Sequence, residues 1–146
     1  MPLIHRAFIN GQPMISVIIG ISEPRQTAMT AGGIAIPPAV TLNLLIDTGA
    51  SCVVLDQDAI ASLNLVPTGV ATMHTPSTGA VPHLCNQYDV SLVIPSPKGV
   101  PFEIGALPIL ESTFRAQGFD GLLGRDVLQQ CVLFYNSPLG GYTLAY

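Results

Sequence analysis

Glycine and proline constrain this chain more than any other feature, because they divide it into segments too short for long helices. The 146 residues include 14 Gly and 13 Pro, and the runs between them are rich in Val, Ile, Leu and Thr. Short runs of this kind bounded by turn residues are typical of all-β domains. A chain of this length can bury a full hydrophobic core as one unit. We therefore expect a single all-β domain over residues 1–146.

The same pattern predicts the individual elements. Asn10-Gly11 is expected to form the two-residue turn of a hairpin between residues 7–9 and 12–19. A short helix is expected at 57–63, with Asp56 as its N-cap, and another at 125–130. Residues 22–38 are interpreted as a polar connection and 118–124 as a glycine-punctuated turn. The other strands are expected at 41–46, 52–55, 70–74, 81–94 and 100–107, with 131–135 and 142–146 as a closing hairpin.

Charge and hydropathy limit the possible partners. Only 10% of the residues are charged and 49% are hydrophobic, against about 25% charged in an average soluble domain. No apolar run approaches the roughly 20 residues of a membrane-spanning helix. The apolar excess therefore favours contact between subunits over a membrane span. The net charge is −4 and the basic residues are scattered, which argues against a nucleic-acid partner.

Cysteine usage bears on the compartment. Cys52, Cys85 and Cys131 cannot all pair within one chain, and unpaired cysteines in apolar surroundings are typical of a reducing environment. The first ten residues lack the apolar stretch and cleavage site of a signal peptide. We therefore expect a cytoplasmic location.

Residues 44–56, LLIDTGASCVVLD, indicate a chemical activity. An aspartate at the end of a buried strand, here Asp47, is held rigidly. The hydroxyl of Thr48 can bond to backbone across a two-fold axis, and Gly49 lets another chain approach closely. Such a triplet arises by chance in roughly one chain in twenty of this size, so a second element has to support it.

Residues 118–134, GFDGLLGRDVLQQCVLF, supply that second element. Together the two segments resemble the retropepsins, the aspartic proteases of the retroviral type, in which the second segment crosses beneath the catalytic loop. Residues 119–124 also resemble part of a pepsin lobe, and 86–94 the strand that leaves the retropepsin flap. The resemblance covers about residues 41–136. It implies a closed all-β barrel with one or two short helices, a flap hairpin, and an active site completed by a second copy of the chain.

The resemblance also implies roles for individual residues. Asp47 matches the catalytic acid. Support of its loop falls to Thr48, Gly49, Gly121, Gly124 and Arg125. The residues implied in substrate binding are Gly49, Ala50 and Ser51, together with a flap tip of Thr75, Pro76, Ser77, Thr78 and Gly79.

One Asp-Thr-Gly motif per chain predicts a homodimer, because the reaction needs two such loops. Two carboxylates about 3 Å apart repel by roughly 5 kcal/mol at an effective dielectric near 20, so they share one proton near neutral pH. The ionised partner then takes a proton from water as it attacks a peptide carbonyl, and the protonated partner donates to the carbonyl oxygen. The expected substrate is an extended polypeptide. This mechanism requires no metal and no cofactor.

Other interpretations remain open. Arg125 could bond to Asp120, Asp126 or backbone carbonyls, because Ser51 and Cys52 occupy positions where retropepsins often carry a second acid. The main alternative function is a catalytically weak or inactive module that binds peptides or dimerises. Three further alternatives are a metal site at His74, His83 and Cys85, Asp120 as an intramolecular partner of Asp47, and Cys52 as a nucleophile.

Overall fold

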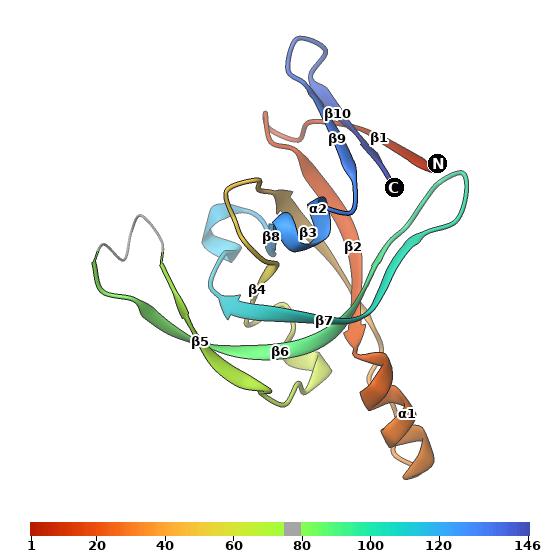
Figure 1. The fold of residues 1–146 in the computed structure, drawn as a ribbon, viewed down its shortest axis with the longest axis vertical. Coiled ribbons are helices and arrows are strands. Elements are labelled where there is room, and N and C mark those ends of the chain that lie inside the picture. Colours follow the sequence, from red (N-terminus) through yellow and green to blue (C-terminus); the bar gives the residue numbers. More distant parts are fainter. Residues whose placement is uncertain (75–79) are drawn as a thin grey trace.

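The computed structural model of the chain describes residues 1–74 and 80–146 (Figure 1). The ten strands are β1 (Leu3–Ala7), β2 (Met14–Ile21), β3 (Val40–Ile46), β4 (Val54–Asp56), β5 (Gly69–Met73), β6 (His83–Ile94), β7 (Phe102–Ser112), β8 (Gly121–Leu123), β9 (Val132–Asn136) and β10 (Gly141–Ala145). The helices are α1 (Glu23–Ala31) and α2 (Arg125–Leu128), with single 3₁₀ turns η1 (Ala61–Leu63) and η2 (Arg115–Gln117).

Most of the strands form one closed barrel. Their order is β2-β3-β8-β4-β7-β6-β5, and β2 also pairs with β6, so the ring closes and β5 extends beyond it. β5 and β6 form the flap hairpin, with Met73 opposite His83. The predicted flap tip, Thr75 to Gly79, lies outside the described residues. The predicted closed all-β barrel with one or two short helices is therefore confirmed.

A second, smaller sheet joins the two ends of the chain. Its order is β1-β10-β9, and both pairings are antiparallel. The predicted closing hairpin corresponds to β9 and β10. Tyr142 and Leu144 point from this sheet into the main core and are fully buried. The small sheet is therefore packed against the barrel, as Figure 1 shows.

The first predicted hairpin is right at its turn and wrong in its strands. Ile9 and Gln12 exchange two backbone hydrogen bonds, at 2.9 and 3.0 Å, around Asn10 and Gly11, which both have positive φ. Beyond the turn, Pro13 has no N–H to extend the ladder. β1 therefore pairs with β10, and β2 pairs with β3.

Three other local predictions need correction. Residues 22–38, interpreted as a connection, contain helix α1. None of its residues is buried, so it lacks the apolar periodicity that reveals a helix, although Ser22 at its N-cap and Pro24 in its first turn are start signals. The helix expected at 57–63 is reduced to the 3₁₀ turn η1. The segment 118–124 contains the short strand β8.

The core lies inside the barrel, and a smaller cluster lies beside the candidate site. The main cluster takes the inward side chains of β2, β3, β6 and β7 and includes Val17, Leu44, Leu92 and Ile109. The smaller cluster contains Met14, Val54, Phe114 and Phe119. No helix in the described part of the chain is long and apolar enough to span a membrane.

Candidate active site

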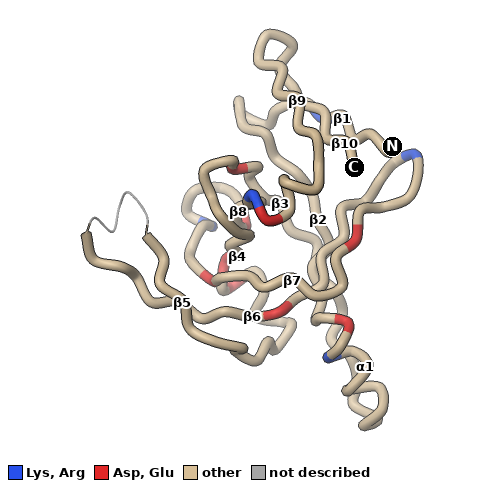
Figure 2. Tube along the Cα trace, viewed as in Figure 1, with Lys and Arg blue, Asp and Glu red and all other residues tan. Residues whose placement is uncertain are grey.

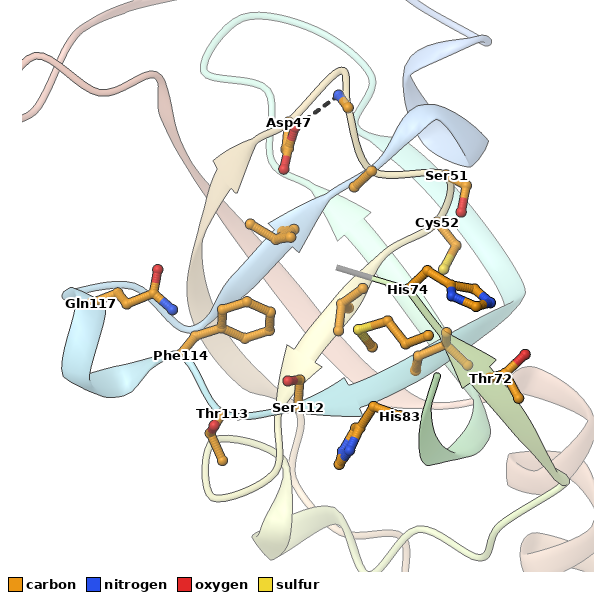
Figure 3. Close-up of a pocket in the computed structure, with 16 residues that line it drawn as sticks. Asp47, Ser51, Cys52, Thr72, His74, His83, Ser112, Thr113, Phe114 and Gln117 are labelled. Carbon is orange, nitrogen blue, oxygen red and sulfur yellow. Dashed lines mark hydrogen bonds between the residues drawn. The ribbon is translucent and has the colours of Figure 1, made fainter. Parts of the chain in front are cut away.

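Asp47 lies where β3 ends, in a tight turn. Its backbone N–H donates to the carbonyl of Leu123 on the parallel strand β8, at 3.1 Å. Its side-chain Oδ1 accepts the N–H of Gly49 at 2.8 Å (Figure 3), and its carbonyl accepts the N–H of Ala50 at 3.2 Å. The carboxylate is thus oriented by its own loop, and the Gly49 contact uses one of the roughly four acceptor sites of a carboxylate.

Gly121 and Gly124 allow β4 and the Asp47 loop to lie directly on β8. A Cβ atom at Gly121 would overlap the carbonyl oxygen of Val54, and one at Gly124 would overlap the backbone carbonyl of Cys52. Gly121 also has a φ of +158°, which suits glycine. The Gly-Leu-Leu-Gly pattern is therefore explained by close backbone packing beneath the loop.

Arg125 bonds to the backbone of the Asp47 loop. Its Nη1 donates to the carbonyls of Thr48 at 3.0 Å and Gly49 at 3.1 Å, and its backbone N–H donates to the carbonyl of Ala50 at 2.9 Å. Of the partners considered for Arg125, the structure selects backbone carbonyls. The neighbouring Asp126 instead accepts the N–H of Val53 at 3.1 Å. The first turn of α2 therefore bonds to both arms of the loop.

The loop borders a cleft of about 760 Å³. Four of the predicted site residues line it: Asp47, Gly49, Ala50 and Ser51. The predicted support residues Thr48, Gly121, Gly124 and Arg125 do not line the cleft. Gly124 and Arg125 contact the Asp47 loop, and Gly121 packs against β4 at Val54. The binding residues assigned to the flap tip lie outside the described residues.

The rest of the cleft wall was not predicted. The flap strands contribute Thr72, Met73, His74 and His83 (Figure 3), and the segment after β7 contributes Thr113, Phe114 and Gln117. Parallel pairing of β4 with β7, which sets Val54 beside Leu110, brings that segment to the loop. Pairing between distant segments leaves no local periodicity to recognise, so the sequence carried no direct signal for this wall.

Asp56 anchors the backbone of the segment after β7, which forms part of this wall. Its side chain is 2% exposed, and its Oδ2 accepts the N–H groups of Phe114 at 2.6 Å and Arg115 at 3.0 Å. Its Oδ1 accepts those of Asp58 and Ala59. Burial by itself raises the pKa of Asp56, but these four donors outweigh it and the pKa lies below its ordinary value. The predicted cap residue is therefore also an anchor for the cleft.

The alternative chemistries lose support. Burial, together with the nearby Asp126, raises the pKa of the Cys52 thiol, which disfavours the nucleophilic thiolate. The carboxylate of Asp120 accepts the N–H of Asn43 at 2.9 Å, four residues before Asp47, and is engaged there. Within residues 1–74 and 80–146, no group of three or more His, Cys, Asp or Glu side chains could hold a metal ion.

Comparison with known proteins agrees with this geometry. A family model described as aspartyl protease matches residues 27–127, more than half of the chain. The chain belongs to the aspartyl protease family. The matched region contains both the Asp47 loop and Arg125, the residue that bonds to its carbonyls. A search of curated protein sequences found no match.

A solved structure shows that this aspartyl protease has a retropepsin-like fold. A retropepsin-like aspartic protease from Rickettsia conorii superposes with a TM-score of 0.60 at 16% identity, covering 99% of this chain and 90% of the other. The EIAV protease in complex with the inhibitor HBY-793 has a TM-score of 0.41 at 21% identity, covering 82% of this chain and 86% of the other. The family model and the Rickettsia conorii structure confirm the family and the fold inferred from Asp47 to Gly49 and from residues 118–134.

Proposed function

We propose that this aspartyl protease is an endopeptidase that acts as a homodimer, with a water molecule activated between the two Asp47 carboxylates. The observation that carries the proposal is the placement of Asp47. It lies at the edge of a cleft of about 760 Å³, on a loop bonded to Arg125, with its Oδ1 oriented by Gly49. Such rigid placement of a carboxylate is what acid–base catalysis requires.

The need for a second copy follows from the composition of the cleft. Asp47 is the only acid among the described residues that line it. Asp120 and Asp56 are each bonded to backbone N–H groups elsewhere. One carboxylate cannot both take a proton from water and donate one to the substrate carbonyl at the same moment. A two-fold axis that brings two copies of Asp47 together provides both groups.

In the dimer, the repulsion between two carboxylates keeps one proton on the pair. The ionised Asp47 accepts a proton from water, whose oxygen attacks the peptide carbonyl carbon. The protonated Asp47 donates to the carbonyl oxygen, which gives a neutral gem-diol. The Asp47 that took the proton from water then donates it to the amide nitrogen, while the other Asp47 takes a proton from a gem-diol hydroxyl. The C–N bond breaks, the carbonyl re-forms as a carboxylic acid, and the pair again holds one proton.

The shape of the cleft suits an extended polypeptide. The flap strands lie on one side of it and the catalytic loop on the other. A substrate in this space can place alternate side chains toward apolar groups such as Met73 and Phe114. Flap closure over the substrate would exclude water from the reacting groups.

The test is peptide hydrolysis by the wild type and by Asp47→Asn. We expect cleavage of unstructured peptides by the wild type, inhibition by pepstatin-like compounds, and a loss of at least about 10³-fold in kcat/KM in Asp47→Asn. The circular dichroism spectrum of the variant should be unchanged, because the Asn oxygen can still accept the Gly49 N–H. Asp58→Asn is the matched control, since Asp58 is exposed and its side chain does not line the cleft.

Two results would count against the endopeptidase. Hydrolysis that is unchanged in Asp47→Asn would show that another group or a contaminant is responsible. A wild type that binds peptides with the same affinity as the variant and cleaves none would identify the alternative, a peptide-binding module without turnover.

A further inference from the structure

The flap carries histidines as its only basic side chains. Residues 59–88, which include β5 and the first half of β6, contain no Asp, Glu, Lys or Arg. Figure 2 shows the described part of the flap strands beside the tip without a charged residue. Two of the three histidines of the chain, His74 and His83, line the cleft from this hairpin. Because histidine gains its charge at mildly acidic pH, these two side chains can make the flap wall of the cleft positive.

The strand register places His83 beside the segment that follows β7. On β6, Gln87 lies opposite Leu110 of β7, and the two strands are antiparallel. The same register continued toward the flap tip brings His83 just past Ser112, where β7 ends. Figure 3 accordingly shows His83 on the side of the cleft that carries Ser112 and Thr113. These three residues, which we call the His83 subsite, lie together although they are distant in the sequence.

The His83 subsite is a set of hydrogen-bond donors. The hydroxyls of Ser112 and Thr113 can each donate, and a protonated imidazole donates from both of its nitrogens. His83 and Thr113 are exposed and Ser112 is half-buried, so a ligand that enters the cleft can reach all three. Donors that include one cation bind an anionic oxygen more strongly than neutral donors do. The chemistry of the subsite therefore suits a carboxylate.

The acids near the His83 subsite face away from it. Asp47 is the only acid among the described residues that line the cleft, and Figure 3 shows it on the opposite side from His83. Glu111 precedes Ser112 on β7, but side chains alternate along a strand. Glu111 accordingly lines a separate hollow with Tyr88, whereas Ser112 lines the cleft. A carboxylate bound at the His83 subsite is therefore kept apart from the reacting Asp47 pair.

The other titratable groups nearby do not change this charge balance. Burial is the main reason that the pKa of Cys52 on the cleft wall and that of Cys85 on β6 are raised, so both thiols are neutral. The Nε of Arg115 lies 3.8 Å from Asp56 and 3.9 Å from Asp120, and Arg115 does not line the cleft. The flap histidines are therefore the groups that set the charge of the cleft wall opposite Asp47.

Apolar side chains adjoin the His83 subsite. Met73 lies opposite His83 in the flap hairpin, and Phe114 follows Thr113 and belongs to the same apolar cluster as Met73. An extended chain places every second side chain on one face. A substrate that sets one apolar side chain against Met73 and Phe114 therefore presents the side chain two residues away to the His83 subsite.

We propose that the cleft selects extended peptides with a Glu or Asp side chain two residues from an apolar one, and that His83 determines this selectivity together with Ser112 and Thr113. This inference rests on the proposed function, because it names the substrate class of the same cleft. The protonated imidazole pairs with one carboxylate oxygen and the hydroxyls donate to the other. The selectivity is therefore greatest at mildly acidic pH and is lost as the imidazole loses its proton.

The experiment first locates the acidic position. The wild type digests a mixed peptide library at about pH 5.5, where Glu and Asp are ionised, and mass spectrometry identifies the cleaved bonds. We expect Glu and Asp to exceed Gln and Asn at one position near the cleaved bond by at least about fivefold. Two peptides that differ only in Glu or Gln at that position then give a ratio of kcat/KM values, the Glu/Gln ratio. Titration of the Asp47 pair affects both peptides alike and cancels in this ratio.

The pH dependence and three variants test the role of His83. The Glu/Gln ratio should fall from at least about five at pH 5.5 to less than about two at pH 7.5, because histidine loses its charge over this range while Glu stays ionised. His83→Gln should remove the preference at both pH values, and His83→Glu should reverse it in favour of a peptide with Lys at the same position. Lys98→Gln is the matched control, since Lys98 lies in the exposed connection between β6 and β7 and does not line the cleft. It should leave the ratio unchanged. Circular dichroism checks that each variant is folded.

Three results would overturn the proposal and leave peptide hydrolysis intact. They are a Glu/Gln ratio near one in the wild type at pH 5.5, a ratio that is unchanged in His83→Gln, and an equal loss of preference in Lys98→Gln, which would assign the selectivity to the overall charge of the protein. The opposite result separates the two proposals. A wild type that cleaves no peptide, but retains Glu and Asp peptides of the library over their amide counterparts and loses this preference in His83→Gln, would refute the proposed function and leave the His83 subsite intact.

Discussion

Replacing Asp56 with Asn should destabilise the fold and loosen the cleft wall together. The carboxylate is 2% exposed and accepts four backbone N–H groups, with Phe114 and Arg115 on Oδ2 and Asp58 and Ala59 on Oδ1. An Asn side chain has one acceptor oxygen, so its NH₂ group must face two of these donors. The variant therefore loses two hydrogen bonds and gains an unfavourable contact between donors.

The magnitude follows from the burial of those donors. A buried donor left unsatisfied costs roughly 1–3 kcal/mol. Because the bond to Phe114 is buried and the bond to Arg115 is partly buried, we expect the free energy of unfolding to fall by about 2–4 kcal/mol. At about 3 °C per kcal/mol for a chain of this size, Tm should fall by about 6–12 °C.

The assay is thermal and urea unfolding followed by circular dichroism at one fixed protein concentration, because the stability of a dimer depends on concentration. Arg115→Gln is the control. The Arg115 side chain is 57% exposed and its Nε lies 3.8 Å from Asp56 Oδ1, so its removal should cost less than about 1 kcal/mol while the backbone N–H stays in place. Equal losses in the two variants would show that the ion pair is responsible. Unchanged stability in Asp56→Asn would refute the reasoning.

The pH dependence gives an independent check. Since four backbone donors hold the pKa of Asp56 below its ordinary value of about 3.8 despite the burial that opposes them, ionised Asp56 stabilises the folded state fully above about pH 4. That stabilisation is lost as the pH falls through the lowered pKa. The difference in unfolding free energy between the wild type and Asp56→Asn should therefore narrow below about pH 4. A difference that is constant across this range would contradict the assigned charge state.

Two further predictions concern the loop and the small sheet. Arg125→Gln should lower kcat/KM by about 10–100-fold, because the Thr48 and Gly49 carbonyls lose their common donor and the loop moves. Arg25→Gln, which removes a similar 3.0 Å bond to the Asn64 carbonyl away from the cleft, should leave activity unchanged, and equal losses in both would contradict this role. Tyr142 donates to the Met14 carbonyl at 2.7 Å, and burial raises its pKa to about 12. Its contribution to stability should be present below pH 10 and lost between about pH 10 and 12. Tyr142→Phe should remove one late-titrating phenol from the ultraviolet titration, and an unchanged titration would refute the assignment.

The sequence was sufficient for the parts of the molecule that depend on near neighbours. Asn10-Gly11 predicts a two-residue turn because both residues tolerate positive φ, and the structure has it. Strand β3 and the loop at Asp47 were predictable because an apolar run ends in an acid that is followed closely by a glycine. Helix α1 was missed because no residue of it is buried, so its only signals are at Ser22 and Pro24.

The tertiary structure decided what depends on distant segments. Only the parallel pairing of β4 with β7 places Phe114 in the cleft wall, and only the contact of α2 with the loop shows that Arg125 bonds to carbonyls and not to Asp120 or Asp126. The three-stranded sheet β1-β10-β9 forms only because β1 pairs with β10 and not with the strand that follows it in the sequence. Periodicity and turn chemistry act over a few residues, so they determine the strands and the Asp47 loop. The partner of each strand is set by which pairing buries the most apolar surface, and that depends on the whole chain.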